Sequence, residues 1–218
     1  GGLNAIRREG DCLLVQAGAS LAAVAAFARD EGLSGMAELG GIPGTVGGGV
    51  LMNAGAYGAE LAQLVTQAEG VSLSDGRRVV YPADRLDFAY RHSALMDAGV
   101  VITQATLALT PGDPETIRAR MEECAKARRE KQPLTLPSAG STFKRPEGHF
   151  AAKLIDDCGL RGLTVGGAQV SEKHAGFIVN IGGATARDML ELMRQVEQRV
   201  FEQTGVQLEP EVRILGED

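Results

Sequence analysis

The sequence contains no tryptophan, and only 4% of its residues are aromatic. Its three cysteines, Cys12, Cys124 and Cys158, are odd in number and lack zinc-ligand spacing, so we expect neither a disulfide framework nor a zinc site. The three histidines are not paired at metal spacing either, and we predict no bound metal. Acidic residues outnumber basic ones, with a net charge of −6, which argues against nucleic acid or a membrane surface as a partner.

Long apolar runs are also missing. No run approaches the roughly 20 residues that a membrane-crossing helix needs, and no signal peptide opens the chain. We therefore expect a cytoplasmic protein. The chain starts at Gly1-Gly2 rather than at a methionine, so we expect its N-terminus to be cut or incomplete.

Signatures of several enzyme classes are absent from the sequence. There is no GxxxxGK[ST] loop, which excludes a P-loop kinase or ATPase, and neither HExxH nor GxSxG occurs. The nearest approach to a dinucleotide fingerprint has Asn53 where the first glycine belongs, ahead of Gly55 and Gly58. It also lies in the wrong place relative to strand and helix, so a Rossmann fold is excluded.

What the sequence does contain is a glycine-rich stretch from Leu39 to Gly58, LGGIPGTVGGGVLMNAGAYG. It holds eight of the chain's 29 glycines and no charged residue. Because glycine lets a backbone approach another group closely, the main chain here is expected to press against something. One interpretation is a tight core crossing between packed layers. The other is a ligand-facing loop whose amides hold a flat or anionic cofactor.

Helix and strand signals are mixed without a regular βαβ repeat, which predicts an α+β fold. Apolar spacing and capping residues predict helices over 20–31, capped by Ser20, from 114 onward, around 150–155, and over 185–205, opened by a capping box of Thr185 and Asp188. In the third of these, a short apolar stripe closed by Gly159 is formed by Phe150, Leu154 and Ile155. A strand followed by a turn is predicted over 12–20, a hairpin over 67–81 with Asp75-Gly76 in its turn, and further strands over 100–109, 176–181 and 211–215. The length allows two small domains, and we predict a boundary near residues 110–113, giving domains 1–111 and 112–218.

Three short clusters hold reactive side chains. Arg91 lies between a tyrosine and a serine in FAYRHS, Ser141 follows a glycine in the proline-flanked PSAGSTFKRP, and Glu211 opens the last predicted strand in LEPEVR. Each has a simpler explanation, namely surface ion pairing, turn capping and a solvated carboxylate, respectively. Taken singly, the clusters leave both explanations open.

In their order along the chain, these motifs resemble the flavin-dependent UDP-N-acetylenolpyruvoylglucosamine reductases of bacterial peptidoglycan synthesis, the MurB family, in its shorter type II form. The resemblance runs from about Gln16 to Gly216. The matching motifs are GIPGTVGG and MNAGAYG from Gly41, YRHS from Tyr90, PSAGSTFKRP from Pro137, GHFAAKLIDDCGLRG from Gly148, VSEKHAGFIVN from Val170 and LEPEVR from Leu208.

The resemblance implies an FAD-binding domain of the vanillyl-alcohol-oxidase-like (PCMH) type joined to an α+β substrate-binding domain, with FAD between them. Family members carry an earlier Gly-Ser-Asn loop that holds much of the FAD diphosphate. Nothing here matches it, so we expect an incomplete flavin domain that lacks its N-terminal part. The implied FAD contacts are Gly41, Ile42, Pro43, Gly44, Thr45, Gly47, Gly48, Asn53, Gly55, Tyr57 and Gly58.

The implied reaction reduces UDP-N-acetylglucosamine enolpyruvate to UDP-N-acetylmuramate, with NADPH as the reductant of FAD, and serves the cell wall and thereby cell shape and division. Hydride addition to the enolpyruvyl β-carbon builds charge on the carboxylate, which the rigid fork of Arg91 would support. Ser141 would donate the proton to the α-carbon. Glu211 would polarise the carboxylate, protonated or screened by Arg91 at that step.

The resemblance also implies substrate contacts. These residues are Tyr90, Lys131, Lys144, Arg145 and His174. Lys131 best fits the position that holds the UDP diphosphate. His174 has an alternative as a hydrogen-bonded structural histidine. The predicted partner is the small UDP-sugar substrate, bound by a monomer.

Two other functions stay open at this point. An FAD oxidase of a hydroxy acid or sugar would share the flavin domain alone and would give Ser141 and Glu211 no role. A non-catalytic nucleotide-sugar binding module would need no proton donor.

Overall fold

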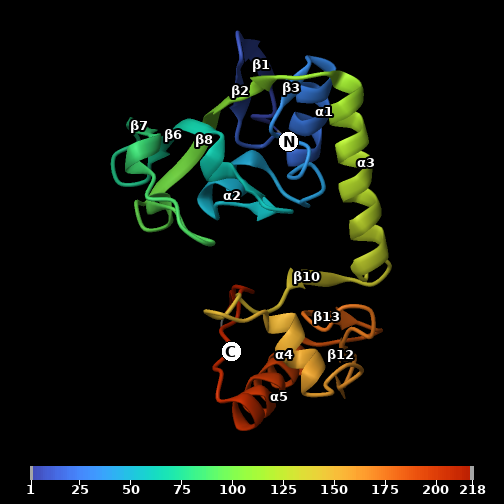
Figure 1. Cartoon of the computed structure of the whole chain (residues 1–218). Helices are drawn as coiled ribbons and strands as arrows, with labels where there is room; N and C mark the ends of the chain where they lie inside the picture. Colours follow the sequence, from blue (N-terminus) through green and yellow to red (C-terminus); the bar gives the residue numbers. More distant parts are fainter. Residues whose placement is uncertain (1, 217–218) are drawn as a thin grey trace. The chain divides into compact units, whose positions relative to one another are not determined.

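The structure, a computed structural model, describes residues 2–216 and consists of two units (Figure 1). The division falls between residues 128 and 129. Most of helix α3 (Pro114–Lys131) therefore belongs to the first unit, where Arg120 Nε lies 2.7 Å from Glu38 Oε1. The boundary that the sequence suggested after residue 111 lies at the start of this helix, and the functional domain boundary stays a prediction.

The first unit is built around an antiparallel five-stranded sheet with the order β1-β2-β8-β6-β7. Its strands are β1 (Ile6–Glu9), β2 (Cys12–Gln16), β6 (Val65–Ser72), β7 (Arg78–Pro82) and β8 (Val100–Ala108). The predicted hairpin is confirmed, with Gly76 at a φ of +70° in its turn. The other elements are β3 (Leu33–Ser34) paired with β9 (Thr110–Pro111), β4 (Gly55–Ala56) paired with β5 (Ala59–Glu60), helices α1 (Leu21–Asp30) and α2 (Val46–Leu51), and 3₁₀ turns over Leu61–Gln63, Ala83–Arg85 and Ala94–Met96.

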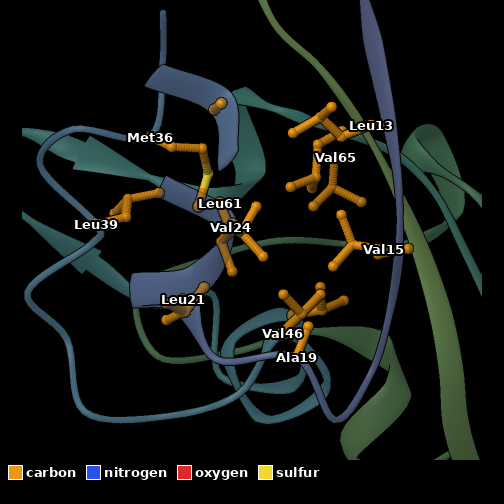
Figure 2. Packing of buried hydrophobic residues seen from close by; sticks show 14 of the residues in the cluster. Leu13, Val15, Ala19, Leu21, Val24, Met36, Leu39, Val46, Leu61 and Val65 are labelled. Carbon is orange, nitrogen blue, oxygen red and sulfur yellow. The ribbon is translucent and has the colours of Figure 1, made fainter. Parts of the chain in front are cut away.

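Helix α1 and the sheet form the core of the first unit. Ser20 caps the helix as predicted, because its Oγ accepts a backbone N–H of the first turn at 3.1 Å. Leu21 and Val24 then face Leu13 and Val15, the alternating residues of β2 that point to one side of the sheet (Figure 2). All four side chains are fully buried, and each such burial stabilises the fold by about 1.5–3 kcal/mol.

The second unit combines a four-stranded antiparallel sheet, with the order β10-β13-β12-β11, and two helices. Its elements are β10 (Ser138–Ser141), α4 (Ala151–Asp157), β11 (Thr164–Val165), β12 (Ala168–Val170), β13 (Phe177–Asn180) and α5 (Ala186–Thr204). The predicted capping box of α5 is present at Thr185 and Asp188, and Gly205 ends the helix at a φ of +72°. Both units mix helices with antiparallel strands, which confirms the predicted α+β fold.

The predicted last strand over 211–215 is wrong. Within the described part of the chain this segment is irregular, and Ile214 and Leu215 are 64% and 92% exposed. Pro210, just before it, forms a bridge with Phe143, and the N–H of Glu211 donates to the carbonyl of Thr142 at 2.8 Å. An alternating apolar pattern forms a strand when one face can be buried, and here no core surface receives it.

The predicted buried stripe of α4 is partly wrong. Leu154 and Ile155 are buried as expected, and Gly159 follows the helix at a φ of +67°. Phe150, however, is the residue that caps the helix and is 62% exposed. The Arg145 guanidinium lies 4.0 Å from the centroid of its ring, so the aromatic face is covered by a cation at the surface instead of by the core.

Candidate active site

The glycine-rich stretch folds around the short helix α2, an element that its sequence did not suggest. Thr45 caps this helix, with its Oγ1 accepting the N–H of Gly48 at 3.5 Å. The carbonyl of Gly44 accepts the N–H of Leu21 at 3.0 Å, which ties the stretch to the start of α1. The backbone of the stretch is therefore held against the core of the first unit.

Some glycines of the stretch are needed for packing. A methyl group placed on Gly47 would lie 2.9 Å from the Cβ of Ala17, and one on Gly49 would lie 2.8 Å from Cδ1 of Leu61. Real Cβ atoms do not come this close to other carbon atoms, so these two glycines let α2 lie directly on its neighbours. For them, the interpretation as a core crossing is correct.

Other glycines face open space. Among the described residues, no heavy atom lies within 4 Å of a methyl group placed on Gly44 or Gly58, and a methyl on Gly48 would meet Thr45 Oγ1 at 3.8 Å. Gly58 also has a left-handed φ of +86°. These positions leave the backbone open to a ligand, as the second interpretation requires.

Two cavities of about 420 Å³ each adjoin the stretch, a size typical of small-molecule sites. One is lined by Thr45, Gly47, Gly48, Leu51, Val101 and Ile102, among others, and is largely apolar. The other is lined by Gly41, Tyr57, Arg29, Arg118, Arg128 and Glu122, among others. The predicted cofactor residues are thus divided between an apolar cavity and one rich in arginine.

Asn53 and Tyr57 both have left-handed backbones, with φ values of 44° and 51°. The Asn53 side chain is 1% exposed; its Nδ2 donates to the carbonyl of Ala89 at 3.0 Å, and its Oδ1 accepts the N–H of Ala62 at 2.9 Å. Since its amide faces the protein, any contact of Asn53 with a cofactor would come from its backbone. Tyr57 is 40% exposed and stays available to a ligand.

Three further predicted cofactor residues differ in accessibility. Ile42 is half-buried and packs against the core of the first unit, whereas Pro43 is exposed. Gly55 pairs with Glu60 in the small β4–β5 sheet, and a methyl group on it would lie 2.8 Å from the carbonyl oxygen of Ala59. We therefore assign Gly55 a packing role, while contacts of the other two with a cofactor stay predictions.

Arg91 lies in a tight turn of the same unit. Ala89 and His92 bond to each other through both backbone N–H groups, at 3.2 and 3.1 Å, so Tyr90 and Arg91 occupy the tip. Arg91 has a φ of +54°, and its guanidinium carbon lies 4.9 Å from the centroid of the Tyr90 ring. Ser93 follows the turn and is fully buried, with its Oγ donating to the carbonyl of Leu51 at 2.8 Å.

In the second unit, the segments that contain Ser141 and Glu211 are joined by Thr142, the residue that follows Ser141 in the chain. The N–H of Thr142 donates to the carbonyl of Gly176 at 2.9 Å, and its own carbonyl accepts the N–H of Glu211 at 2.8 Å. Its side-chain Oγ1 accepts the N–H of Ile178 at 3.1 Å. Thr142 is 3% exposed, and its three bonds fix Ser141 beside the segment of Glu211.

Ser141 itself is exposed at the end of β10. The pairing of β10 with β13 shifts register between Ser138 and Ser141, and Gly140 has a left-handed φ of +87° in this irregularity. An extra residue in one strand re-aims the side chains that follow it. The predicted exposed hydroxyl is therefore present, on a bulged strand end instead of a loop.

The predicted cationic substrate residues lie on the surface of the second unit. Lys131, at the end of α3, is exposed. Lys144 Nζ lies 3.1 Å from Glu209 Oε2, and Arg145 stacks on Phe150 as described above. Ion pairs this exposed are worth little energetically, so Lys144 can exchange Glu209 for another anion at small cost.

His174 is a half-buried residue with structural contacts. Its Nδ1 accepts the N–H of Gly176 at 3.2 Å, and its ring meets that of Phe177 edge to face with centroids 4.9 Å apart. Burial lowers the pKa of His174 below its ordinary value. These contacts support the structural role and leave Nε2 as the atom that could face a substrate.

Sequence reasoning missed Ser93 and Thr142, two buried residues whose hydrogen bonds hold the segments of the candidate site. Both stand in motifs that the sequence singled out, but their importance lies in burial and in hydrogen bonds to distant backbone groups.

Residues 2–216 include no set of three His, Cys, Asp or Glu side chains arranged to hold a metal ion. Over the same residues, no helix is both long and apolar enough to span a bilayer.

Family models match both halves of the chain. Residues 2–81 match the FAD binding domain, and residues 132–215 match the C-terminal domain of UDP-N-acetylenolpyruvoylglucosamine reductase. The reductase of that name from Agathobacter rectalis is 51% identical over 211 residues, which cover 96% of this chain and 67% of the relative. That from Pediococcus pentosaceus is 49% identical, covering 98% and 71%.

A solved structure agrees with these matches. The crystal structure of the reductase (MurB) from Thermus caldophilus superimposes with a TM-score of 0.81 at 42% identity and covers 92% of this chain and 71% of that one.

The fold and the two matched domains define a flavin-dependent oxidoreductase. Within that class, the chain belongs to the UDP-N-acetylenolpyruvoylglucosamine reductase (MurB) family. The predicted family, fold class and cofactors, FAD with NADPH as reductant, are thereby confirmed. An FAD oxidase that shares the flavin domain alone is disfavoured, since the match over 132–215 lies outside that domain.

Proposed function

We propose that this chain reduces the enolpyruvyl ether of UDP-N-acetylglucosamine enolpyruvate with NADPH, through FAD, to UDP-N-acetylmuramate for peptidoglycan synthesis. The observation that carries the proposal is that Ser141 and Glu211, 70 positions apart, belong to segments that the backbone bond between Thr142 and Glu211 joins. This arrangement lies within the segment that matches the reductase's C-terminal domain.

The first unit fits FAD. Gly44, Gly48 and Gly58 leave the backbone open, and the apolar cavity beside Thr45 suits a flat ring system. The second cavity carries Tyr57 and three arginines, which suit anionic or aromatic groups. When bound, FAD carries a hydride from NADPH to the substrate. The contacts proposed for it are the backbones of Gly41, Pro43, Gly44, Gly48, Asn53 and Gly58, and the side chains of Ile42, Thr45 and Tyr57, with Gly47 and Gly55 contributing close packing.

Arg91 is proposed to hold the substrate carboxylate. A planar guanidinium can bind both carboxylate oxygens, and its charge becomes more valuable as negative charge grows on them when hydride reaches the β-carbon. Tyr90, stacked beneath the guanidinium, limits its movement and offers an aromatic surface to the substrate. Differential binding of this kind lowers the barrier of the hydride step.

Ser141 is proposed to donate the proton that completes the reaction. Ser141 is exposed at the end of β10, next to the hydrogen-bonded Thr142, and a hydroxyl becomes an effective acid when it is held beside a strongly basic carbon centre. The proton moves from Oγ to the substrate α-carbon. Glu211 would polarise the carboxylate together with Arg91, protonated or screened by it at that moment.

The UDP diphosphate is proposed to lie against Lys131, with Lys144 and Arg145 as further cations and His174 Nε2 as an additional contact. All of these belong to the second unit. Because diphosphate is anionic, removing a cation should raise KM more than it lowers kcat. We further propose that the protein acts as a cytoplasmic monomer without a nucleic-acid partner, in keeping with its net charge of −6.

The proposal is tested by separating the two half-reactions. In the FAD-loaded enzyme, Ser141→Ala should leave reduction of the flavin by NADPH unchanged and should slow its reoxidation by the enolpyruvyl substrate by about 10²–10⁴-fold. Stopped-flow flavin absorbance measures both. Ser138→Ala, a serine on the same strand, serves as the matched control and should retain both rates.

If Ser141→Ala slows flavin reduction by NADPH as much as it slows reoxidation by the substrate, the serine is not the proton donor. A non-catalytic binding module predicts a different result, namely that the unaltered protein binds the UDP-sugar but its flavin is not reoxidised by it.

A further inference from the structure

Left-handed backbone conformations cluster in two segments of the first unit. Among the described residues, the non-glycine residues with positive φ are Leu3, Asn53, Tyr57, Asp87 and Arg91. Asn53 and Tyr57 lie in the glycine-rich stretch, Arg91 lies in its turn, and Asp87 lies four residues before Arg91. A residue with a Cβ is disfavoured in this conformation. Such residues persist where the surrounding structure holds them, often at functional sites.

Two buried side chains stabilise the Arg91 turn through hydrogen bonds to backbone carbonyls. Ser93, 0% exposed, donates from Oγ to the carbonyl of Leu51 at 2.8 Å. Asn53, 1% exposed, donates from Nδ2 to the carbonyl of Ala89 at 3.0 Å. One bond ends shortly before Arg91 in the chain and the other begins shortly after it, so the two bracket the turn.

The two bonds join segments that are distant in sequence. They span 36 and 42 residues of chain, so they are not the local side-chain bonds that commonly stabilise turns. Asn53 also accepts the N–H of Ala62, which uses both ends of its amide. A buried amide and a buried hydroxyl are costly unless each finds its partner, and a fully satisfied polar contact specifies one geometry more sharply than apolar packing does.

We infer that Asn53 and Ser93 are positioning residues that hold Arg91 in the left-handed conformation in which its guanidinium receives the substrate carboxylate. The inference rests on the proposed function, because it gives Arg91 that role. It also links two parts of the first unit with proposed roles in the reaction. The segment that follows α2, which carries proposed FAD contacts, fixes the turn of Arg91, which is proposed to bind the substrate. Neither residue touches the reacting atoms; both act through Arg91.

Loss of either bond should release the turn. Arg91 can then relax to the right-handed conformations that its Cβ favours, and its guanidinium moves away from the carboxylate. A displacement of about 1 Å at a reacting group can cost about 10²-fold in rate. The loss should fall on the substrate half-reaction, while flavin reduction by NADPH, in which Arg91 has no proposed part, should persist.

A double-mutant cycle on the FAD-loaded enzyme tests this. Ser93→Ala should slow reoxidation of the reduced flavin by the enolpyruvyl substrate by about 10- to 100-fold and leave its reduction by NADPH within about 2-fold. In the Arg91→Lys background, where the bidentate contact is already lost, Ser93→Ala should add less than about 2-fold, because residues that act through one group are not additive.

If Ser93→Ala does not fold, Asn53→Ala gives the same comparison of reoxidation rates at the other bond. Because the Asn53 backbone is a proposed FAD contact and its Oδ1 also accepts the N–H of Ala62, these rates are measured at saturating FAD and the Kd for FAD is determined alongside. Thr204→Val is the matched control, since it removes a hydroxyl that donates to the backbone carbonyl of Val200 at 2.7 Å, in α5. It should leave both half-reactions unchanged.

The outcomes are distinguishable. Equal fold-losses from Ser93→Ala in both backgrounds, or no loss in the unaltered background, would overturn the positioning role. An Arg91→Lys enzyme with unaltered rates would instead refute the proposed function of Arg91. The inference is supported if Ser93→Ala slows reoxidation in the unaltered enzyme but causes no further slowing in the Arg91→Lys background.

Discussion

Gly48 offers a direct test of whether α2 presents its backbone to a ligand. A methyl group on this residue would meet Thr45 Oγ1 at 3.8 Å, an ordinary contact. Replacing a glycine inside a helix by alanine stabilises the helix by about 0.5–1 kcal/mol. Gly48→Ala should therefore raise the free energy of unfolding of the cofactor-free protein by this amount, and its Tm by about 1–4 °C.

The same methyl group should weaken FAD binding. It would project into the cavity beside Thr45, where overpacking costs about 1–3 kcal/mol. The corresponding increase in Kd is roughly 5- to 150-fold. Gly48→Ala is thus expected to separate the two properties, giving a more stable protein that binds its cofactor less tightly.

Gly49 is the matched control one position along the helix. A methyl group there would lie 2.8 Å from Cδ1 of Leu61 and 3.5 Å from Cδ1 of Leu21, and both leucines are fully buried. The overpacking cost of about 1–3 kcal/mol offsets the helix gain, so Gly49→Ala should lower the free energy of unfolding by up to about 2 kcal/mol. Gly47→Ala should lower it further, because a methyl there would also lie 3.2 Å from the Ala17 carbonyl oxygen, which belongs to the backbone.

Circular dichroism during heating measures Tm of the cofactor-free variants, and quenching of flavin fluorescence measures the Kd for FAD. The argument is refuted if Gly48→Ala binds FAD as tightly as the unaltered protein, or if it is less stable than Gly49→Ala.

Three further predictions concern the second unit. Thr142→Val leaves the buried N–H of Ile178 without its acceptor and should lower the free energy of unfolding in urea by about 1–3 kcal/mol; an unchanged urea midpoint would contradict this. Because burial lowers the pKa of His174, the unfolded chain binds its proton more readily, so stability should be full above the ordinary pKa of about 6.5 and fall as pH drops below it. Urea midpoints of His174→Gln should lack this fall, and an identical pH profile would argue against it. Thr185→Ala removes the cap of α5 and should lower the free energy of unfolding by about 1 kcal/mol in the same assay. An unchanged urea midpoint would show that the capping hydrogen bond does not stabilise the protein in solution.

The helix caps and turns are features that the local sequence predicts correctly. Ser20 and Thr185 were expected to open helices, Gly76 to lie in the hairpin turn and Gly205 to end the last helix, and the structure confirms all four. Each depends on bonds within a few residues of chain, where the interacting groups are visible in the sequence.

The failed predictions depend on surfaces that the local pattern does not contain. The segment 211–215 alternates as a strand does, and Phe150 has the spacing of a buried helix residue, yet neither finds an apolar surface to cover. Periodicity predicts which face of an element could be buried, and the packing of distant elements decides whether it is.

From the order of its motifs the sequence identified the family, and it also supplied the residues that are proposed to react, Arg91, Ser141 and Glu211. The tertiary structure alone decided which glycines pack and which face open space, and that Asn53, Ser93 and Thr142 are buried. The physical reason is that burial and hydrogen-bond partners are properties of segments brought together from positions dozens of residues apart. A motif specifies a side chain, whereas its conformation and its partners depend on the rest of the fold.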